Sequence, residues 1–325
     1  MATALIGCPK RPPPPQAVVV TPPPQPDRVV ERVADRLTAV GARWVVLIEP
    51  ERLRAVTWLA PHLARLLKDE RLDALASTTG IDVRLAREVV LAGYGDEDTV
   101  AYFVRHPSEQ ALVERRFRAR LTGEVHHRRW AHQLVTAWGR IGEAPHGYVG
   151  IGPDVAGFQY GGDEKRGPMR VAVLYELGEL EKVPRLLSTE ALGALSNALG
   201  EAPAKLLLPG PFEGDMARGA RGLFTAAEAV GLGLTPGPED KLVLQIVLAG
   251  DYGDTGDLTR ATDIAQLAWG DLAGSSLGHL LGLPQEDVVS TPHPLGLELR
   301  APLSAAELTA GLAAATMDEV RDFLK

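Results

Sequence analysis

Residues 274–278 read G-S-S-L-G, which is the G-x-S-x-G spacing that surrounds the catalytic serine of many esterases. Asp287 and His293 follow in the order of an esterase triad, and Ser276 would be the nucleophile. Such a serine needs a strand before it and a helix after it, whereas residues 264–272 have helical spacing. We therefore expect small residues that let two helices pack closely. A serine hydrolase using Ser276 stays an alternative.

Three histidines lie close together in the sequence, at His126, His127 and His132. Their spacing differs from the i, i+4 pair of a helical zinc site, and no carboxylate lies among them. Arg128 and Arg129 lie between the histidines and would repel a dication. We expect solvent-exposed histidines here, with no metal and no other cofactor.

Two acidic turns carry oxygen ligands of the kind that calcium binds. Neither turn has the spacing of an EF-hand loop, and carboxylates in exposed turns commonly accept hydrogen bonds from backbone amides. We expect that capping role, with calcium binding in the second turn as the alternative. The first turn contains Asp96, Glu97 and Asp98, and the second contains Asp251, Asp254 and Asp257.

A dense run of arginines could bind anions. Leu112, Phe117 and Leu121 predict the inward side of a helix, so a solvated outer face is the simpler interpretation of the arginines around them. The functional alternative is contact with lipid head groups or lipopolysaccharide, because guanidinium groups pair bidentately with phosphate. The run contains Arg115, Arg116, Arg118 and Arg120, with Arg128 and Arg129 beyond the helix.

The composition of the 325 residues is that of an ordinary globular protein, with 45% hydrophobic residues and a net charge of −8. An acidic chain argues against a general nucleic-acid binder, because that class carries excess Lys and Arg to neutralise phosphates. The charge is divided unevenly. Residues 1–162 hold 21 basic and 18 acidic side chains, whereas residues 163–325 hold 13 and 24. The two halves could attract each other across an interface, which we favour, or the first half could face an anionic surface.

The amino terminus is the part of the sequence that points to a location. Cys8 is the single cysteine, which excludes an internal disulfide framework. No apolar run reaches the 18 or more residues of a membrane-spanning helix. Residues 9–26 are rich in proline and should stay extended as a tether, spanning up to about 55 Å at ~3.1 Å per residue.

Leu5, Ile6, Gly7 and Cys8 resemble the lipobox of bacterial lipoproteins. The resemblance implies that Cys8 carries the lipid and becomes the mature N-terminus. Too few residues precede it for a complete signal peptide, so we interpret residues 1–26 as a truncated signal with its lipobox and proline-rich tether. Pro9 stands where lipoproteins retained in the inner membrane of enteric bacteria have Asp, which implies the outer membrane, facing the periplasm or the exterior.

A short phrase occurs twice, at residues 90–96 and again, with one inserted Asp, at residues 247–254. Both copies read as a strand that ends in an acidic, glycine-containing turn. We interpret them as one α/β unit used twice. Residues 66–104 should then superpose on residues 221–262, with Gly93 and Gly250 at equivalent strand ends.

The periodicity predicts helices and strands that interleave without strict alternation, which favours an α+β fold with a mixed, largely antiparallel sheet. We expect two related α/β halves, 27–162 and 163–325, which could form one compact domain. The expected helices cover 27–40, 51–67 with a restart at Pro61, 70–76, 107–121, 183–199, 217–230, 258–281 and 304–324. The expected strands cover 44–48, 89–91, 99–104, 133–138, 147–152, 155–160, 170–177, 205–208 and 242–249, with an extended pair in 287–299.

The body of the chain is similar in style and order to uncharacterised lipoproteins of high-GC Gram-negative bacteria such as myxobacteria, and this similarity implies no activity. The sequence contains no convergent set of acid, base and nucleophile. We therefore expect a non-enzymatic lipoprotein that is held in the membrane by its lipid anchor. It would bind or scaffold an envelope protein or lipid and no nucleic acid. A carrier or sensor of an apolar ligand, with an internal cavity, is the main alternative.

Overall fold

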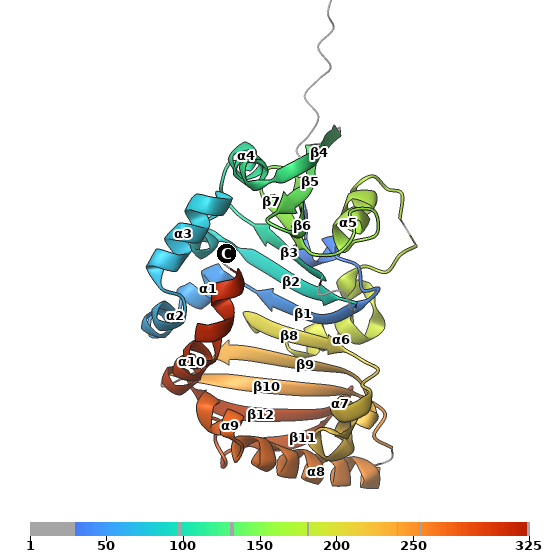
Figure 1. The fold of residues 1–325 in the computed structure, drawn as a ribbon. Coiled ribbons are helices and arrows are strands. Elements are labelled where there is room, and N and C mark those ends of the chain that lie inside the picture. Colours follow the sequence, from blue (N-terminus) through green and yellow to red (C-terminus); the bar gives the residue numbers. More distant parts are fainter. Residues whose placement is uncertain are drawn as a thin grey trace, which may run out of the picture.

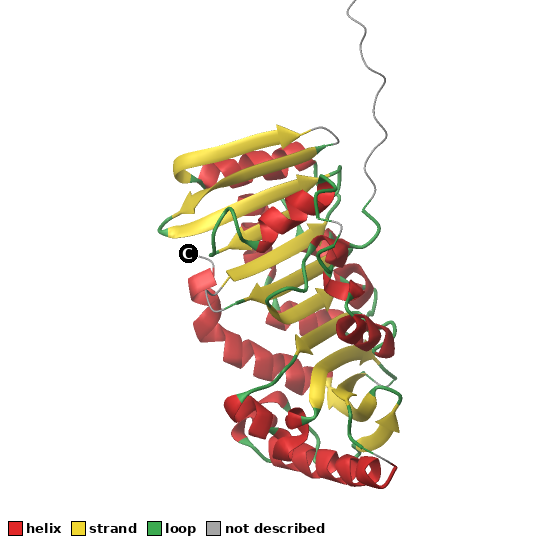
Figure 2. Ribbon diagram, turned by 90° about the vertical axis from the view of Figure 1, so that its right-hand side faces the viewer, coloured by secondary structure: helices red, strands yellow, loops and turns green. Residues whose placement is uncertain are grey.

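A computed structural model describes residues 30–95, 99–130, 133–180, 182–238, 240–253 and 255–323. These residues form one sheet of twelve strands with helices on both faces (Figures 1 and 2). The strands are β1 (Ala42–Ile48), β2 (Glu88–Tyr94), β3 (Thr99–Arg105), β4 (Thr122–Trp130), β5 (Leu134–Ile141), β6 (Ala144–Ile151), β7 (Val155–Tyr160), β8 (Ala204–Pro209), β9 (Ala227–Pro236), β10 (Lys241–Gly250), β11 (Val289–His293) and β12 (Gly296–Ser304).

The helical elements connect and cover these strands. They are α1 (Pro50–Arg54), α2 (Ala60–Leu66), α3 (Asp69–Thr79), α4 (Gln110–Arg120), α5 (Pro168–Glu176), α6 (Glu190–Ala198), α7 (Gly214–Arg218), α8 (Thr255–Ala273), α9 (Ser276–Leu281) and α10 (Ala305–Phe323), with the 3-10 turns η1 (Val33–Arg36), η2 (Val83–Leu85), η3 (Leu186–Ser188) and η4 (Ala220–Thr225). Within the described ranges, no helix is both long and apolar enough to cross a membrane.

The sheet order is β11-β12-β10-β9-β8-β1-β2-β3-β7-β6-β5-β4, and each neighbouring pair is antiparallel. This confirms the α+β prediction with a largely antiparallel sheet. The sheet is continuous across the β1–β8 pair, where Val45 lies opposite Leu207. The two expected halves therefore share one sheet, with their boundary in the chain between β7 and β8.

The two halves have the same topology. Strands β1, β2, β3, β7 and β6 occur in the same spatial order as β8, β9, β10, β12 and β11. In both halves the last strand returns to pair with the third, and a helix follows the third strand. The first half adds the hairpin β4–β5 at its outer edge. Because β1 and β8 pair antiparallel, an approximate twofold axis between them would relate the halves.

The repeated phrase does not mark this correspondence, so the expected superposition of residues 66–104 on 221–262 is wrong. The first copy ends β2, whereas the second ends β10, which corresponds to β3. The two glycines also have different roles. A side chain on Gly93 would collide with the indole of Trp44, and one on Gly250 would collide with the carbonyl of Ala226.

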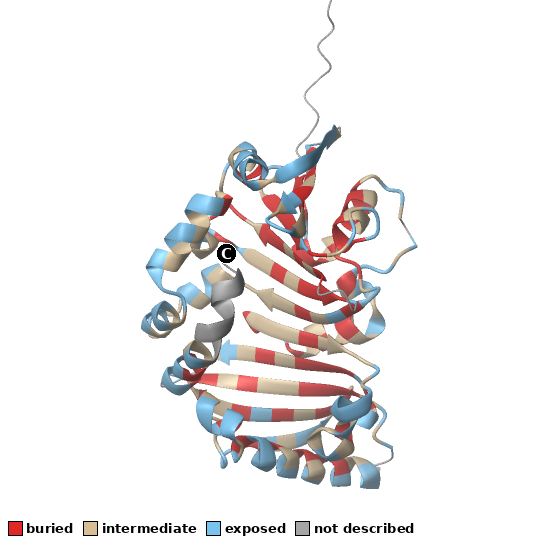
Figure 3. Ribbon diagram, viewed as in Figure 1, coloured by how far each residue is buried: buried red, intermediate tan, exposed pale blue. Residues whose placement is uncertain are grey.

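Alternating side chains build a core on each face of the sheet. Phe103 packs on the face covered by η1, η3, α5 and α6, which we call the α5 face. Its neighbours Tyr102 and Val104 pack on the opposite face, with Phe117 of α4, and we call this the α4 face. In the second half, α8, α9 and α10 cover the α4 face. Figure 3 shows the buried strands between helices whose outer sides are exposed.

Several predicted elements differ from the structure. The described part of 27–40 contains only the turn η1, although Val33 and Leu37 are buried as the apolar spacing suggested. Residues 170–177 were expected as a strand but lie almost entirely in helix α5. Residues 217–230 were expected as one helix and instead form the end of α7, η4 and the start of β9. The sequence did not predict β4 or β9.

Candidate functional site

Helix α4 and edge strand β4 bring the predicted arginines together at one end of the sheet (Figure 1). The carboxylate of Glu114 on α4 joins the two elements, and this residue is only 4% exposed. It accepts hydrogen bonds from Nε2 of His127 at 2.8 Å, from Arg129 at 2.7 Å and from Arg118 at 3.4 Å. We call the surface formed by Arg115, Arg116, Arg118, Arg120, Arg128 and Arg129 the basic end.

Strand β4 directs its cations to both faces, because successive side chains of a strand alternate. His127 and Arg129 point to α4, as their bonds to Glu114 show. On the α5 face the guanidinium of Arg128 lies 4.7 Å from the ring centre of Trp130, within cation–π range. The basic end therefore extends around the edge of the sheet.

His126 is a titratable side chain on the α5 face. Its ring contacts Glu164 at 2.7 Å and Glu124 at 3.2 Å. Hydrogen bonds to Glu164 and then Glu124 raise its pKa above the ordinary histidine value. The ring thus keeps its proton to a higher pH than a free histidine, and this edge of the sheet becomes more positive as pH falls.

Three arginines of the basic end are free to bind an anion. Arg115, Arg116 and Arg120 are exposed, and within the described part of the chain their side chains make no hydrogen bond or ion pair. In contrast, Arg118 and Arg129 are held by Glu114. The free guanidinium groups are the chemically available part of this surface, since each can present a planar fork to a phosphate.

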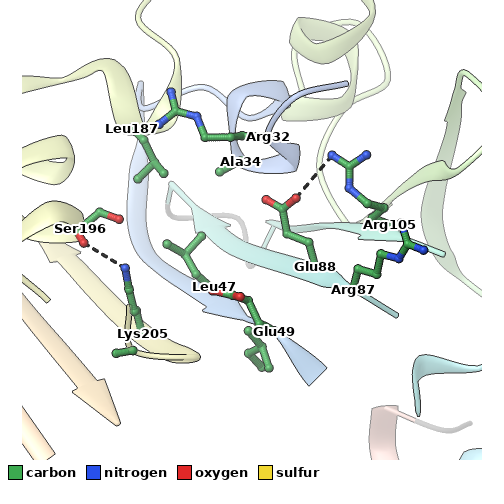
Figure 4. A pocket seen from close by; sticks show the side chains of 12 residues that line it. Arg32, Ala34, Leu47, Glu49, Arg87, Glu88, Arg105, Leu187, Ser196 and Lys205 are labelled. Atoms are coloured by element: carbon green, nitrogen blue, oxygen red, sulfur yellow. Dashed lines mark hydrogen bonds and ion pairs between the residues drawn. The ribbon is translucent and has the colours of Figure 1, made fainter. Parts of the chain in front are cut away.

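The cavity at the junction of the two halves is lined by cations and carboxylates whose groups already bond other parts of the protein (Figure 4). Its volume is ≈ 510 Å³. Arg105 already bonds Asp154 and the carbonyl of Val30. Lys205 donates to the carbonyls of Ser196 and Gly200 at the end of α6, and its burial lowers its pKa. Burial raises the pKa of Glu88. We interpret the charged side chains of this cavity as structural, because they already bond other groups of the protein.

An apolar groove of ≈ 350 Å³ lies between helices α1, α2 and α3 and the sheet. Neither α1 nor α2 contains a buried residue, although both carry leucines. The groove is lined by Ile48, Pro50, Leu53, Leu63, Leu67, Leu72, Val83 and Val89, with Arg54, Asp69 and Arg84 among its charged residues. This volume falls in the range of small-molecule pockets.

Ser276 does not lie on the esterase turn that was the alternative to helix packing. Ser276 is the first residue of α9, which directly follows helix α8, so the strand that a nucleophile turn requires is missing. The small residues have the packing role that the sequence suggested. A Cβ on Gly278 would lie 2.2 Å from the carbonyl oxygen of Leu272, and one on Gly311 of α10 would lie 2.0 Å from that of Leu280.

The calcium and metal candidates are only partly within the described residues. Asp251 accepts a hydrogen bond from the backbone amide of Gly253 at 2.9 Å, which is the capping role expected of it. Its predicted co-ligand Asp254 is outside the described ranges. So are Cys8, Asp96, Glu97, Asp98 and His132. In the part of the chain that the structure describes, no cluster of three His, Cys, Asp or Glu side chains could hold a metal ion.

Comparisons with known proteins give similarity only to solved structures. No protein-family model matches the chain, and no curated protein matches it significantly. The similar structures include crystal forms of TP0453. Form III has a TM-score of 0.47 and 11% identity, covering 88% of this chain and 99% of that chain. Form IV has a TM-score of 0.46 and 12% identity, and the match covers 84% of this chain and 93% of that chain. At this level the similarity assigns neither a family nor a function.

Proposed function

We propose that this protein is a lipid-anchored lipoprotein of the outer membrane that acts by binding or scaffolding. The observation that supports this best is the basic end, where arginines separated in the sequence form one exposed surface. Cys8 would hold the chain in the membrane, and the tether in residues 9–26 would let the folded domain turn its basic end to anionic head groups. This role needs no catalytic constellation.

The position of the first described residues suits this arrangement. Arg105, at the end of β3, donates hydrogen bonds to the carbonyls of Val30 and Glu31. The next helix in the chain is α4, whose outer face carries arginines of the basic end. The tether therefore joins the folded domain in the half that carries the proposed membrane contact.

Binding of the Cys8→Ser chain to vesicles tests the proposed contact, because this variant lacks the residue that would carry the lipid. We expect binding to vesicles that contain an anionic phospholipid, weak binding to purely zwitterionic vesicles, and a loss of binding as salt screens the charges. Vesicle co-sedimentation over a series of salt concentrations measures all three. Equal binding to both vesicle types, or binding that salt does not weaken, would contradict an electrostatic contact.

The opposite end of the sheet could serve an envelope-protein partner. Leu277 and Leu280 are 53% and 43% exposed on α9, and Leu267 on α8 is 55% exposed. Val289 on edge strand β11 is 58% exposed. Exposed leucines on the neighbouring helices α8 and α9 offer an apolar surface to a partner. The protein would then bind the membrane at one end and a partner at the other.

The apolar groove favours a second candidate function, the carrier or sensor of an apolar ligand. Ala64 is exposed and lines the groove. We expect a fluorescent fatty acid to bind the wild-type chain, and Ala64→Trp to weaken its binding about tenfold or more by filling the groove, a loss of ~1.4 kcal/mol. Ala74→Trp on the exposed side of α3 is the matched control. Unchanged binding in Ala64→Trp would exclude this groove.

A further inference from the structure

A second pocket lies on the α5 face beside the basic end. It has a volume of ≈ 380 Å³ and is formed by β5, helix α5 and the segment that leads into that helix. We call it the Trp138 pocket. Its lining includes Thr136, Trp138, Glu164, Lys165, Met169 and Arg170. None of these residues belongs to the surface proposed to contact the membrane.

The indole of Trp138 is fixed in place by a glycine. Trp138 on β5 is the cross-strand partner of Gly147 on β6. A Cβ at position 147 would lie only 2.0 Å from Cζ3 of the indole, so the ring occupies space that only a glycine leaves open. A ring held against a strand is a preorganised surface for a ligand, because little rotamer freedom remains to be lost on binding.

The pocket also has positive charge that the described residues do not neutralise. Lys165 is exposed and Arg170 is half-buried, and in the described part of the chain neither side chain makes a hydrogen bond or ion pair. Glu164 is the carboxylate of the pocket, and one of its oxygens is already 2.7 Å from His126. Because His126 offsets Glu164, Lys165 and Arg170 remain available for an anion.

Thr136 and Glu164 add polar groups beside the ring. The threonine hydroxyl can donate or accept a hydrogen bond, and the Glu164 carboxylate can accept from a hydroxyl group. The pocket thus combines an apolar ring surface, two free cations and partners for hydroxyl groups. A few polar groups around an apolar floor are typical of small-molecule sites.

We propose that the Trp138 pocket binds a phosphorylated sugar. The apolar side of the sugar ring lies on the indole, the phosphate lies between Lys165 and Arg170, and Thr136 and Glu164 contact the hydroxyl groups. The pocket contributes one aromatic ring with hydroxyl-binding groups beside it, which suits a sugar better than a nucleobase stacked on aromatic rings. This proposal does not depend on the membrane contact.

Calorimetric titration of the full chain with glucose 6-phosphate, adenosine monophosphate and inorganic phosphate tests the assignment. Glucose 6-phosphate should bind most tightly. Arg170→Gln and Trp138→Leu should each weaken it about tenfold or more, since the first removes a charged hydrogen bond to the phosphate and the second removes the aromatic surface under the sugar ring. Arg166→Gln, an exposed arginine of the same segment that does not line this pocket, is the matched control.

Arg170→Gln changes a half-buried helix residue outside the core clusters, so its effect can be read even if Trp138→Leu fails to fold. The assignment is overturned if glucose 6-phosphate does not bind, or if Arg170→Gln binds it as well as the wild type does. If adenosine monophosphate bound more tightly than glucose 6-phosphate, the ligand of the pocket would be a nucleotide and not a sugar phosphate. If inorganic phosphate bound as tightly as glucose 6-phosphate, the indole would have no role in binding. Either of these two results contradicts the proposal.

Discussion

A Cys8→Ser variant with a complete native leader should leave the membrane fraction in a high-salt wash, whereas the wild-type protein should remain there. A lipid on Cys8 would contribute about 0.8 kcal/mol for each buried CH₂ group, and more than one acyl chain gives stable anchoring. Among the described residues, no helix has the length and apolarity to span a membrane. Immunoblots of membrane and supernatant fractions measure the difference.

The same fractionation in low salt separates the anchor from the basic end. The Cys8→Ser chain should keep some membrane binding in low salt, because the arginines still attract anionic lipid, and should lose it as salt rises. A lipid anchor on the wild-type chain would be insensitive to this screening. A Cys8→Ser chain that stays with the membrane in high salt would show that another part of the protein holds it.

Replacing Arg115, Arg116 and Arg120 with glutamine should weaken binding of the Cys8→Ser chain to anionic vesicles about 100-fold at low salt. Each basic residue near an anionic surface contributes about 1 kcal/mol, so three contribute ~3 kcal/mol, and ~1.4 kcal/mol is a tenfold change. These side chains make no ion pair or hydrogen bond with the other described residues, so the fold should not change. Vesicle co-sedimentation measures the effect.

The matched control replaces three exposed cations elsewhere, Arg65, Lys68 and Arg260, with glutamine. It makes the same change in net charge but leaves the basic end intact, so its binding should fall far less. An equal loss in both triple variants would mean that vesicle binding follows total charge. That result would remove the basic end from the proposed function.

The fold class could be predicted because the buried strands carry strong apolar runs. β1, β2 and β10 each read as a short run bounded by turn residues, and all three are strands. Helix α5 was missed because its apolar run, residues 171–175, has no clear period. The better signal was Pro168 directly after Gly167, since proline favours the first turn of a helix.

Strands β4 and β9 were missed for different reasons. β4 is an edge strand that is exposed along almost its whole length, so its sequence shows no alternation of apolar and polar residues. β9 contains Gly231 and Gly233, which weaken a strand pattern. There the leucines of α6 pack against the backbone, and a Cβ on Gly231 would lie 3.1 Å from Leu199.

The arginine run was visible in the sequence, but the group that assembles it was not. Arg118 of α4 and Arg129 of β4 are joined because both donate to Glu114 of α4, and this pairing depends on the position of an unpredicted strand. The Trp138 pocket was missed for the same reason. Its residues come from β5 and from helix α5, which the sequence predicted as a strand.

Mass spectrometry of the mature N-terminal peptide tests the lipid anchor most directly. The peptide is isolated from membranes of cells that express the chain with its native leader. The account predicts a chain that begins at Cys8 and carries covalently bound acyl groups, with fatty-acid label in the same peptide. An N-terminal peptide that retains residues 1–7, or an unmodified Cys8 in the membrane fraction, would contradict it.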